Sequence, residues 1–157
     1  MSTPTGVDPR VSGAYQQALV AEYAAVFGYG VLGPRLTDVN EQTQARTDEQ
    51  SHRDLIATTQ TRLTAANLTP IEPQVSYPLP YPVQDADTAR RFALRLESLT
   101  AAAWRYLIAS AAGAGSTQDL AMIRTDAATA LTAAAVREVG WRRLITPSNP
   151  TVPFPGT

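Results

Sequence analysis

The 157-residue sequence contains no cysteine, no lysine and only one histidine, His52. The lack of cysteine excludes disulfides, iron–sulfur clusters, thiolate zinc sites and cysteine nucleophiles. The sequence has no run of about 18 apolar residues, so we expect no membrane-spanning helix. The first ten residues are polar and lack the apolar segment of a signal peptide. A cytoplasmic location is therefore expected.

Charge and length restrict the class of protein further. The formal net charge is −1, which does not favour nucleic acid or an anionic membrane as a partner. A chain of 157 residues is long enough to bury a core of its own, and it predicts a single domain over residues 1–157.

Apolar residues recur at helical spacing in four segments, each with start and stop signals. Asp8-Pro9 and Asp38 are typical of helix starts, and Gly33-Pro34, Gly113 and Pro147 are typical of helix ends. The four expected helices cover residues 9 to about 32, about 39 to 66, a start capped by Asp85 or Asp87 to about 112, and a start capped by Ser116 to about 145.

Residues 67–84 differ in character because they contain five prolines, which forbid a helix. An extended segment of this length can cross from one end of a bundle to the other, which makes the third helix parallel to the second. Residues 1–7 and 146–157 are expected to be extended tails. The sequence therefore predicts an all-α, up-down-down-up four-helix bundle with one long proline-rich crossover, the ferritin-like arrangement.

Four polar residues lie where this pattern expects apolar core residues. Glu49 and His52 are three residues apart on the second helix, so both side chains share one face. Glu22 lies on the inward face of the first helix at the same expected height, and Glu97 lies on an inward face of the third. A bundle metal site uses a Glu from each of two helices and a Glu-x-x-His from each of the other two. The fourth helix should then contribute a second pair near Leu131, where the sequence has neither acid nor histidine.

The chain resembles the ferritin-like proteins over nearly its whole length. The run Ala-Glu-Tyr-Ala-Ala-Val-Phe-Gly-Tyr-Gly at 21–30, the helix with Glu49 and His52, the segment Tyr-Pro-Leu-Pro-Tyr-Pro-Val at 77–83 and the alanine-rich second half are similar to an actinobacterial, alanine-rich ferritin-like family of no established activity. The resemblance implies the bundle and a homodimer, and for the wider superfamily it implies iron or manganese with oxidase, oxygenase or storage roles.

Two main functions follow from these observations. In the first, Glu22, Glu49, His52 and Glu97 hold one Fe, Mn or Zn ion at a half-degenerate dimetal site. In the second, the chain is a non-catalytic dimeric bundle whose acids pair with His52 or with an arginine such as Arg53 or Arg105.

The first helix carries aromatic and small residues beside its inward face. Tyr23, Phe27, Gly28 and Gly30 are expected to face a partner subunit or, alternatively, the crossover segment. A third, weaker function is the binding of an apolar ligand in a cavity beside the alanines of the fourth helix.

Overall fold

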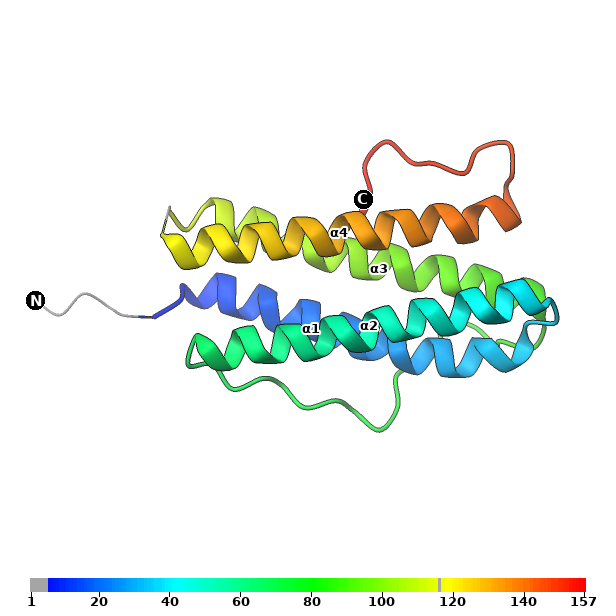
Figure 1. Ribbon diagram of the computed structural model, residues 1–157, viewed down its shortest axis with the longest axis horizontal. Helices are drawn as coiled ribbons and strands as arrows, with labels where there is room; N and C mark the ends of the chain where they lie inside the picture. Colours follow the sequence, from blue (N-terminus) through cyan, green and yellow to red (C-terminus); the bar gives the residue numbers. More distant parts are fainter. Residues whose placement is uncertain (1–5, 116) are drawn as a thin grey trace, which may run out of the picture.

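The computed structural model describes residues 6–115 and 117–157, and it confirms the all-α bundle. Figure 1 shows α1 and α4 running in one direction and α2 and α3 in the other, which is the predicted up-down-down-up order. The described residues contain no strand. The elements are α1 (Pro9–Leu32), the 3₁₀ turn η1 (Gly33–Arg35), α2 (Val39–Ala65), α3 (Ala86–Ala112) and α4 (Gln118–Ile145).

The helix starts are fixed by side-chain caps. The carboxylates of Asp8, Asp38 and Asp85 accept hydrogen bonds from the first free backbone N–H groups of α1, α2 and α3. Thr117 caps α4, whereas the predicted cap Ser116 lies outside the described residues.

The end of α1 differs in detail from the prediction. Gly33 keeps a right-handed conformation (φ −52°) and begins η1 together with Pro34, so the chain leaves α1 through a tighter helical turn and not through a left-handed glycine.

The crossover between α2 and α3 lies along the outer side of α1, as Figure 1 shows below the bundle. Tyr23 donates from its hydroxyl to the carbonyl of Ile71, and the Phe27 ring packs against Tyr77 at 5.8 Å between centroids. Gly28 faces Leu96 of α3, whereas Gly30 is exposed and a Cβ there would meet nothing within 4 Å. The alternative of contact with the crossover is therefore confirmed for Tyr23 and Phe27.

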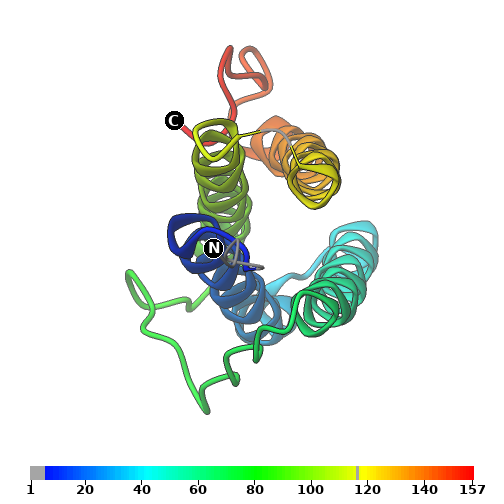
Figure 2. The same cartoon turned by 90° about the vertical axis from the view of Figure 1, so that its left-hand side faces the viewer.

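The four helices are not evenly spaced. Close backbone packing joins α3 with α4, α1 with α3 and α1 with α2, whereas α2 and α4 hardly approach each other. Figure 2, which looks along the bundle, shows these two helices standing apart. Side chains bridge this α2–α4 seam: Trp141 reaches Asp48, and Arg62 reaches Asp126.

Helix α3 buries Glu97, as expected, on a face that also carries Ala93, Thr100, Trp104 and Leu107. Phe92 and Leu96 are buried as well, whereas Leu99 is half exposed.

The C-terminal tail returns to α3, with Arg105 donating to the carbonyl of Gly156. Phe154 in this tail is exposed. In the part of the chain that the structure describes, no helix combines the length and the apolar character needed to cross a membrane.

Candidate functional site: a buried charge network

His52 lies at the centre of the bundle between two carboxylates. Its Nδ1 is 2.5 Å from Glu22 Oε2, and its Nε2 is 3.0 Å from Glu97 Oε1. All three side chains are fully buried. Helices α1, α2 and α3 each contribute one of them, so three of the four predicted site residues converge.

Each of the two carboxylates has further partners. Trp104 Nε1 donates to the second oxygen of Glu22 at 2.7 Å. Tyr29 donates from its hydroxyl to Glu97 Oε1 at 2.6 Å, and Arg137 Nε of α4 donates to Glu97 Oε2 at 2.9 Å. The oxygens of both buried acids are therefore matched to protein donors, as the cost of burying a carboxylate requires.

A fifth ionisable side chain, Asp48, extends the cluster toward the α2–α4 seam. Its Oδ2 accepts a 2.9 Å hydrogen bond from Trp141 Nε1 and lies 3.4 Å from the Tyr29 hydroxyl. Trp141 is fully buried, and Asp48 is 7% exposed. We call Glu22, His52, Glu97, Arg137 and Asp48, with their partners Tyr29, Trp104 and Trp141, the central network.

The surroundings decide the charge of each group. Burial alone lowers the pKa of His52, but the hydrogen bonds and charges of Glu22 and Glu97 outweigh it and raise that pKa to about 9. Burial raises the pKa of Glu97, yet the hydrogen bond and charge of His52 and the charge of Arg137 lower it below its usual value. At neutral pH, His52 is therefore an imidazolium that donates from both ring nitrogens, and two cations face the two acids Glu22 and Glu97.

The outer members titrate differently. Burial, followed by the charge of Glu97, raises the pKa of Asp48 to about 6. Burial and the charges of Glu97 and Asp48 raise the pKa of Tyr29 well above its usual value, so Tyr29 stays a neutral donor.

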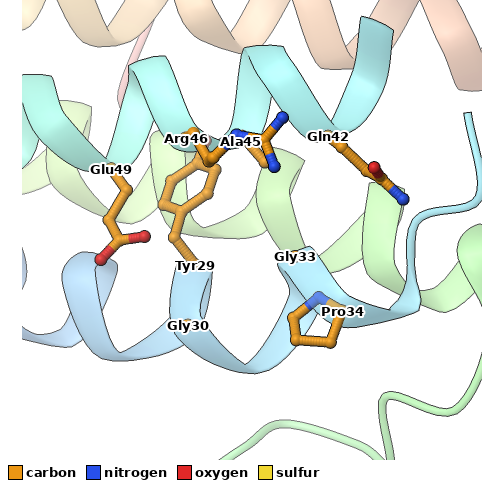
Figure 3. Close-up of a pocket in the computed structure, with 8 residues that line it drawn as sticks. All are labelled: Tyr29, Gly30, Gly33, Pro34, Gln42, Ala45, Arg46 and Glu49. Carbon is orange, nitrogen blue, oxygen red and sulfur yellow. The ribbon is translucent and has the colours of Figure 1, made fainter. Parts of the chain in front are cut away.

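Glu49 does not join the central network. It accepts from Arg53, one turn along α2, at 2.6 Å, and about a quarter of its side chain is exposed. Figure 3 shows it in a surface hollow of about 430 Å³ beside Tyr29 and Arg46. The inward face of α2 instead carries Ala45, Asp48 and His52, so the acid that turns inward with His52 is Asp48, four residues before it.

Helix α4 meets the site through residues that the sequence argument did not select. Arg137 lies opposite Glu97, six residues beyond the expected position near Leu131, a difference of about 9 Å along a helix. Near the start of α4, Arg124 donates to the carbonyls of Ala111 and Gly115 at the end of α3. Arg53 pairs with Glu49, as one alternative expected, but the arginine that pairs with Glu97 is Arg137 and not Arg105. An arginine in the alanine- and valine-rich middle of α4 was the available signal.

The donor set as arranged does not fit a metal ion. A histidine ligand must present a lone pair, whereas both His52 nitrogens face carboxylates, and a guanidinium occupies one side of Glu97. Within residues 6–115 and 117–157, no group of three or more acids and histidines has an arrangement that can hold a metal. Metal binding by Glu22, Glu49, His52 and Glu97 stays a prediction.

The fold and the site define an all-α four-helix protein with a buried ionic network. Residues 14–157 match the model of the family described as "Domain of unknown function (DUF4439)", and the chain belongs to this family. It is similar to the crystal structure of a conserved hypothetical protein, rv2844, from Mycobacterium tuberculosis, with a TM-score of 0.77 and 29% sequence identity over 93% of this chain and 97% of that chain. No curated protein matches the chain significantly.

Proposed function

We propose that this protein is a non-catalytic helical-bundle interaction protein, in which a network of protein charges stands where ferritin-like proteins hold metal. The observation that carries the proposal is the position of His52, whose two ring nitrogens each face a buried carboxylate, Glu22 and Glu97. Arg137 supplies a second fixed cation in the same place. Two protein cations beside the two acids compensate the charge that a divalent ion would otherwise compensate.

A network of this kind contributes to the specificity of packing more than to reaction chemistry. Buried ion pairs add little net stability, but removing one partner is costly, so they favour one arrangement of the helices over others. Here the central network joins all four helices, including the widely spaced α2 and α4. The predicted partner of the bundle is a second copy of the chain, and Leu99 and Tyr106 are half-exposed apolar side chains of α3 available to such a contact.

The second candidate is a mononuclear metal centre, favoured by the convergence of Glu22, His52 and Glu97 from three helices. It requires His52 to lose its proton and release one of the two carboxylates. The affinity of such a site rises with pH, because a metal displaces that proton.

Elemental analysis combined with thermal unfolding distinguishes the two candidates. We expect far less than one equivalent of Fe, Mn or Zn in the purified protein, and no change in Tm when Mn²⁺, Zn²⁺ or EDTA is added. One equivalent of metal, together with a metal-dependent rise in Tm that His52→Gln abolishes, overturns the first proposal.

The interaction part of the proposal has its own test. Light scattering of the purified chain should give the mass of a dimer, and the pair of changes Leu99→Glu and Tyr106→Glu should give a folded monomer. The changes Arg46→Glu and Arg53→Glu on an exposed part of α2 are the matched control. A wild-type monomer at all concentrations contradicts the homodimer.

A further inference from the structure

A hollow of about 560 Å³ lies on the α2–α4 seam, and two members of the central network, Asp48 and Arg137, line it. Figure 2 shows α2 and α4 standing apart on this side of the bundle. The α4 wall is small and apolar at Ala135, Val136 and Val139, beside the alanine run where a cavity was expected from the sequence. Because charged side chains from both helices also line the hollow, it does not suit a purely apolar ligand.

Asp48 differs from the other buried acids because it has no cation beside it. In the part of the chain that the structure describes, four other buried acids each form an ion pair with a histidine or an arginine: Glu22, Glu41, Glu97 and Glu138. Asp48 is 7% exposed, and its partners there are the neutral Trp141 Nε1 and Tyr29 hydroxyl. A buried carboxylate without a cation is costly.

The titration of Asp48 agrees with this lack of a cation. Its pKa is raised to about 6 by burial and by the charge of Glu97, whereas the pKa of Glu97, which has two cations beside it, is lowered. A pKa of about 6 leaves Asp48 mostly ionised at pH 7.5. The hollow therefore presents an uncompensated negative charge on its α2 side.

The α4 side of the hollow carries guanidinium groups with unused donors. Arg137 donates from Nε to Glu97, and its Nη2 is buried without a partner among the described residues. Arg143 also lines the hollow, is exposed, and forms no ion pair with any residue that the structure describes. Guanidinium groups of this kind are the preferred partners of carboxylates.

We propose that the seam hollow binds a small zwitterion of the amino-acid class, with its ammonium group paired with Asp48 and its carboxylate with Arg137 and Arg143. The ammonium group supplies the cation that Asp48 lacks, and the carboxylate accepts from the unused guanidinium donors. A volume of about 560 Å³ is typical of small-molecule sites. This site is separate from the function proposed above, whose tests measure metal content and mass.

The test uses L-leucine as the probe, with two counterparts that each lack one of its charges. Isoamylamine is leucine without the carboxylate, and 4-methylpentanoate is leucine without the ammonium group. Binding is followed by amide chemical shifts at pH 7.5. We expect L-leucine to shift the amides of Asp48, Val136 and Gly140, and to bind about tenfold more tightly than either counterpart, the worth of one charged hydrogen bond.

Two variants separate the two ends of the ligand. Asp48→Asn keeps an acceptor for Trp141 and should weaken L-leucine and isoamylamine by about tenfold without weakening 4-methylpentanoate. Arg143→Gln, at an exposed position, should weaken L-leucine and 4-methylpentanoate without weakening isoamylamine. The matched controls are Asp54→Asn and Arg46→Gln, at exposed positions of α2 outside the hollow, and they should leave all three affinities unchanged.

Three results overturn the proposal. The first is that L-leucine at millimolar concentration shifts no amides along the seam. The second is that L-leucine binds no more tightly than either counterpart, because the two charges then have no joint role. The third is that Asp48→Asn and Arg143→Gln change the affinities no more than their controls do.

Discussion

Replacing His52 with glutamine removes the cation that joins Glu22 to Glu97. Glutamine keeps a polar side chain but lacks the charge and the second ring donor, so two buried carboxylates lose part of their compensation. Breaking a buried ion pair by removing one partner costs about 3–5 kcal/mol. We therefore expect His52→Gln to be less stable than the wild type by about that amount at pH 7.

The pH dependence gives a sharper magnitude. The pKa of His52 is about 9 in the folded protein, against an ordinary value of 6.5. At 1.36 kcal/mol per pKa unit, this difference corresponds to about 3 kcal/mol of stability. Because the folded-state pKa is raised, this contribution is fully present below about pH 6.5 and is lost as the pH rises through 9.

Urea unfolding followed by circular dichroism between pH 6 and 10 measures both effects. The wild type should lose about 3 kcal/mol more than His52→Gln over this interval, so the two stabilities converge at high pH. Arg53→Gln is the control, since its ion pair with Glu49 is exposed, and it should change stability by less than about 1 kcal/mol at every pH. Parallel curves for wild type and His52→Gln would refute a charged His52.

Three further predictions concern single residues. Arg137→Met leaves Glu97 without its second cation and should lower the free energy of unfolding in urea by about 3–5 kcal/mol. A decrease below about 1 kcal/mol would show that this ion pair does not stabilise the fold. Asp48→Asn keeps an acceptor for Trp141 and removes a buried acid whose pKa is raised to about 6. Because a raised folded-state pKa makes this acid costly once it ionises, the wild type should lose stability relative to the variant from pH 4 to 6, and the variant should be more stable at pH 7 by up to about 3 kcal/mol. Equal unfolding curves for the two proteins would contradict this. Gly156→Ala puts a Cβ 2.8 Å from the backbone of Ala101, and Gly156 has a φ of +78° that an alanine rarely adopts. The C-terminal tail should therefore detach from α3 and become sensitive to protease, while the Tm of the bundle hardly changes. A tail as resistant to protease as in the wild type would exclude this packing.

The fold was predictable because its signals are local. Aspartates at three helix starts, a proline-rich crossover and two short connections define four helices and their directions. The caps at Asp8, Asp38 and Asp85 need no knowledge of tertiary contacts, and the structure confirms them.

The site was only partly predictable, because it depends on how each helix is rotated about its own axis and on which residues of neighbouring helices stand at the same level. Asp48 and Glu49 lie four and three residues before His52, and both spacings put a side chain on the same helix face, so spacing alone did not decide which acid turns inward. The observed stripe contains the polar residues Asp48 and Thr59, which the hydrophobic pattern disfavours.

The predicted position of the site along α4 was wrong for a different reason. Counting residues from the turn compares backbone levels, whereas a long side chain on α4 leans toward the N-terminus of its helix and can reach Glu97 from further along. Arg137 therefore meets Glu97, where the count expected a residue near Leu131. A shift of this kind depends on how the two helices pack, and no local pattern in the sequence specifies it.

The protonation of His52 tests the central claim most directly, and its ¹⁵N NMR signals need no assignment because it is the only histidine. At pH 7.5, both ring nitrogens should show the chemical shifts of protonated imidazolium nitrogens, with titration only near pH 9. One unprotonated ring nitrogen at pH 7.5, or a metal-dependent shift of either signal, would contradict the proposal that protein charges occupy the centre of this bundle.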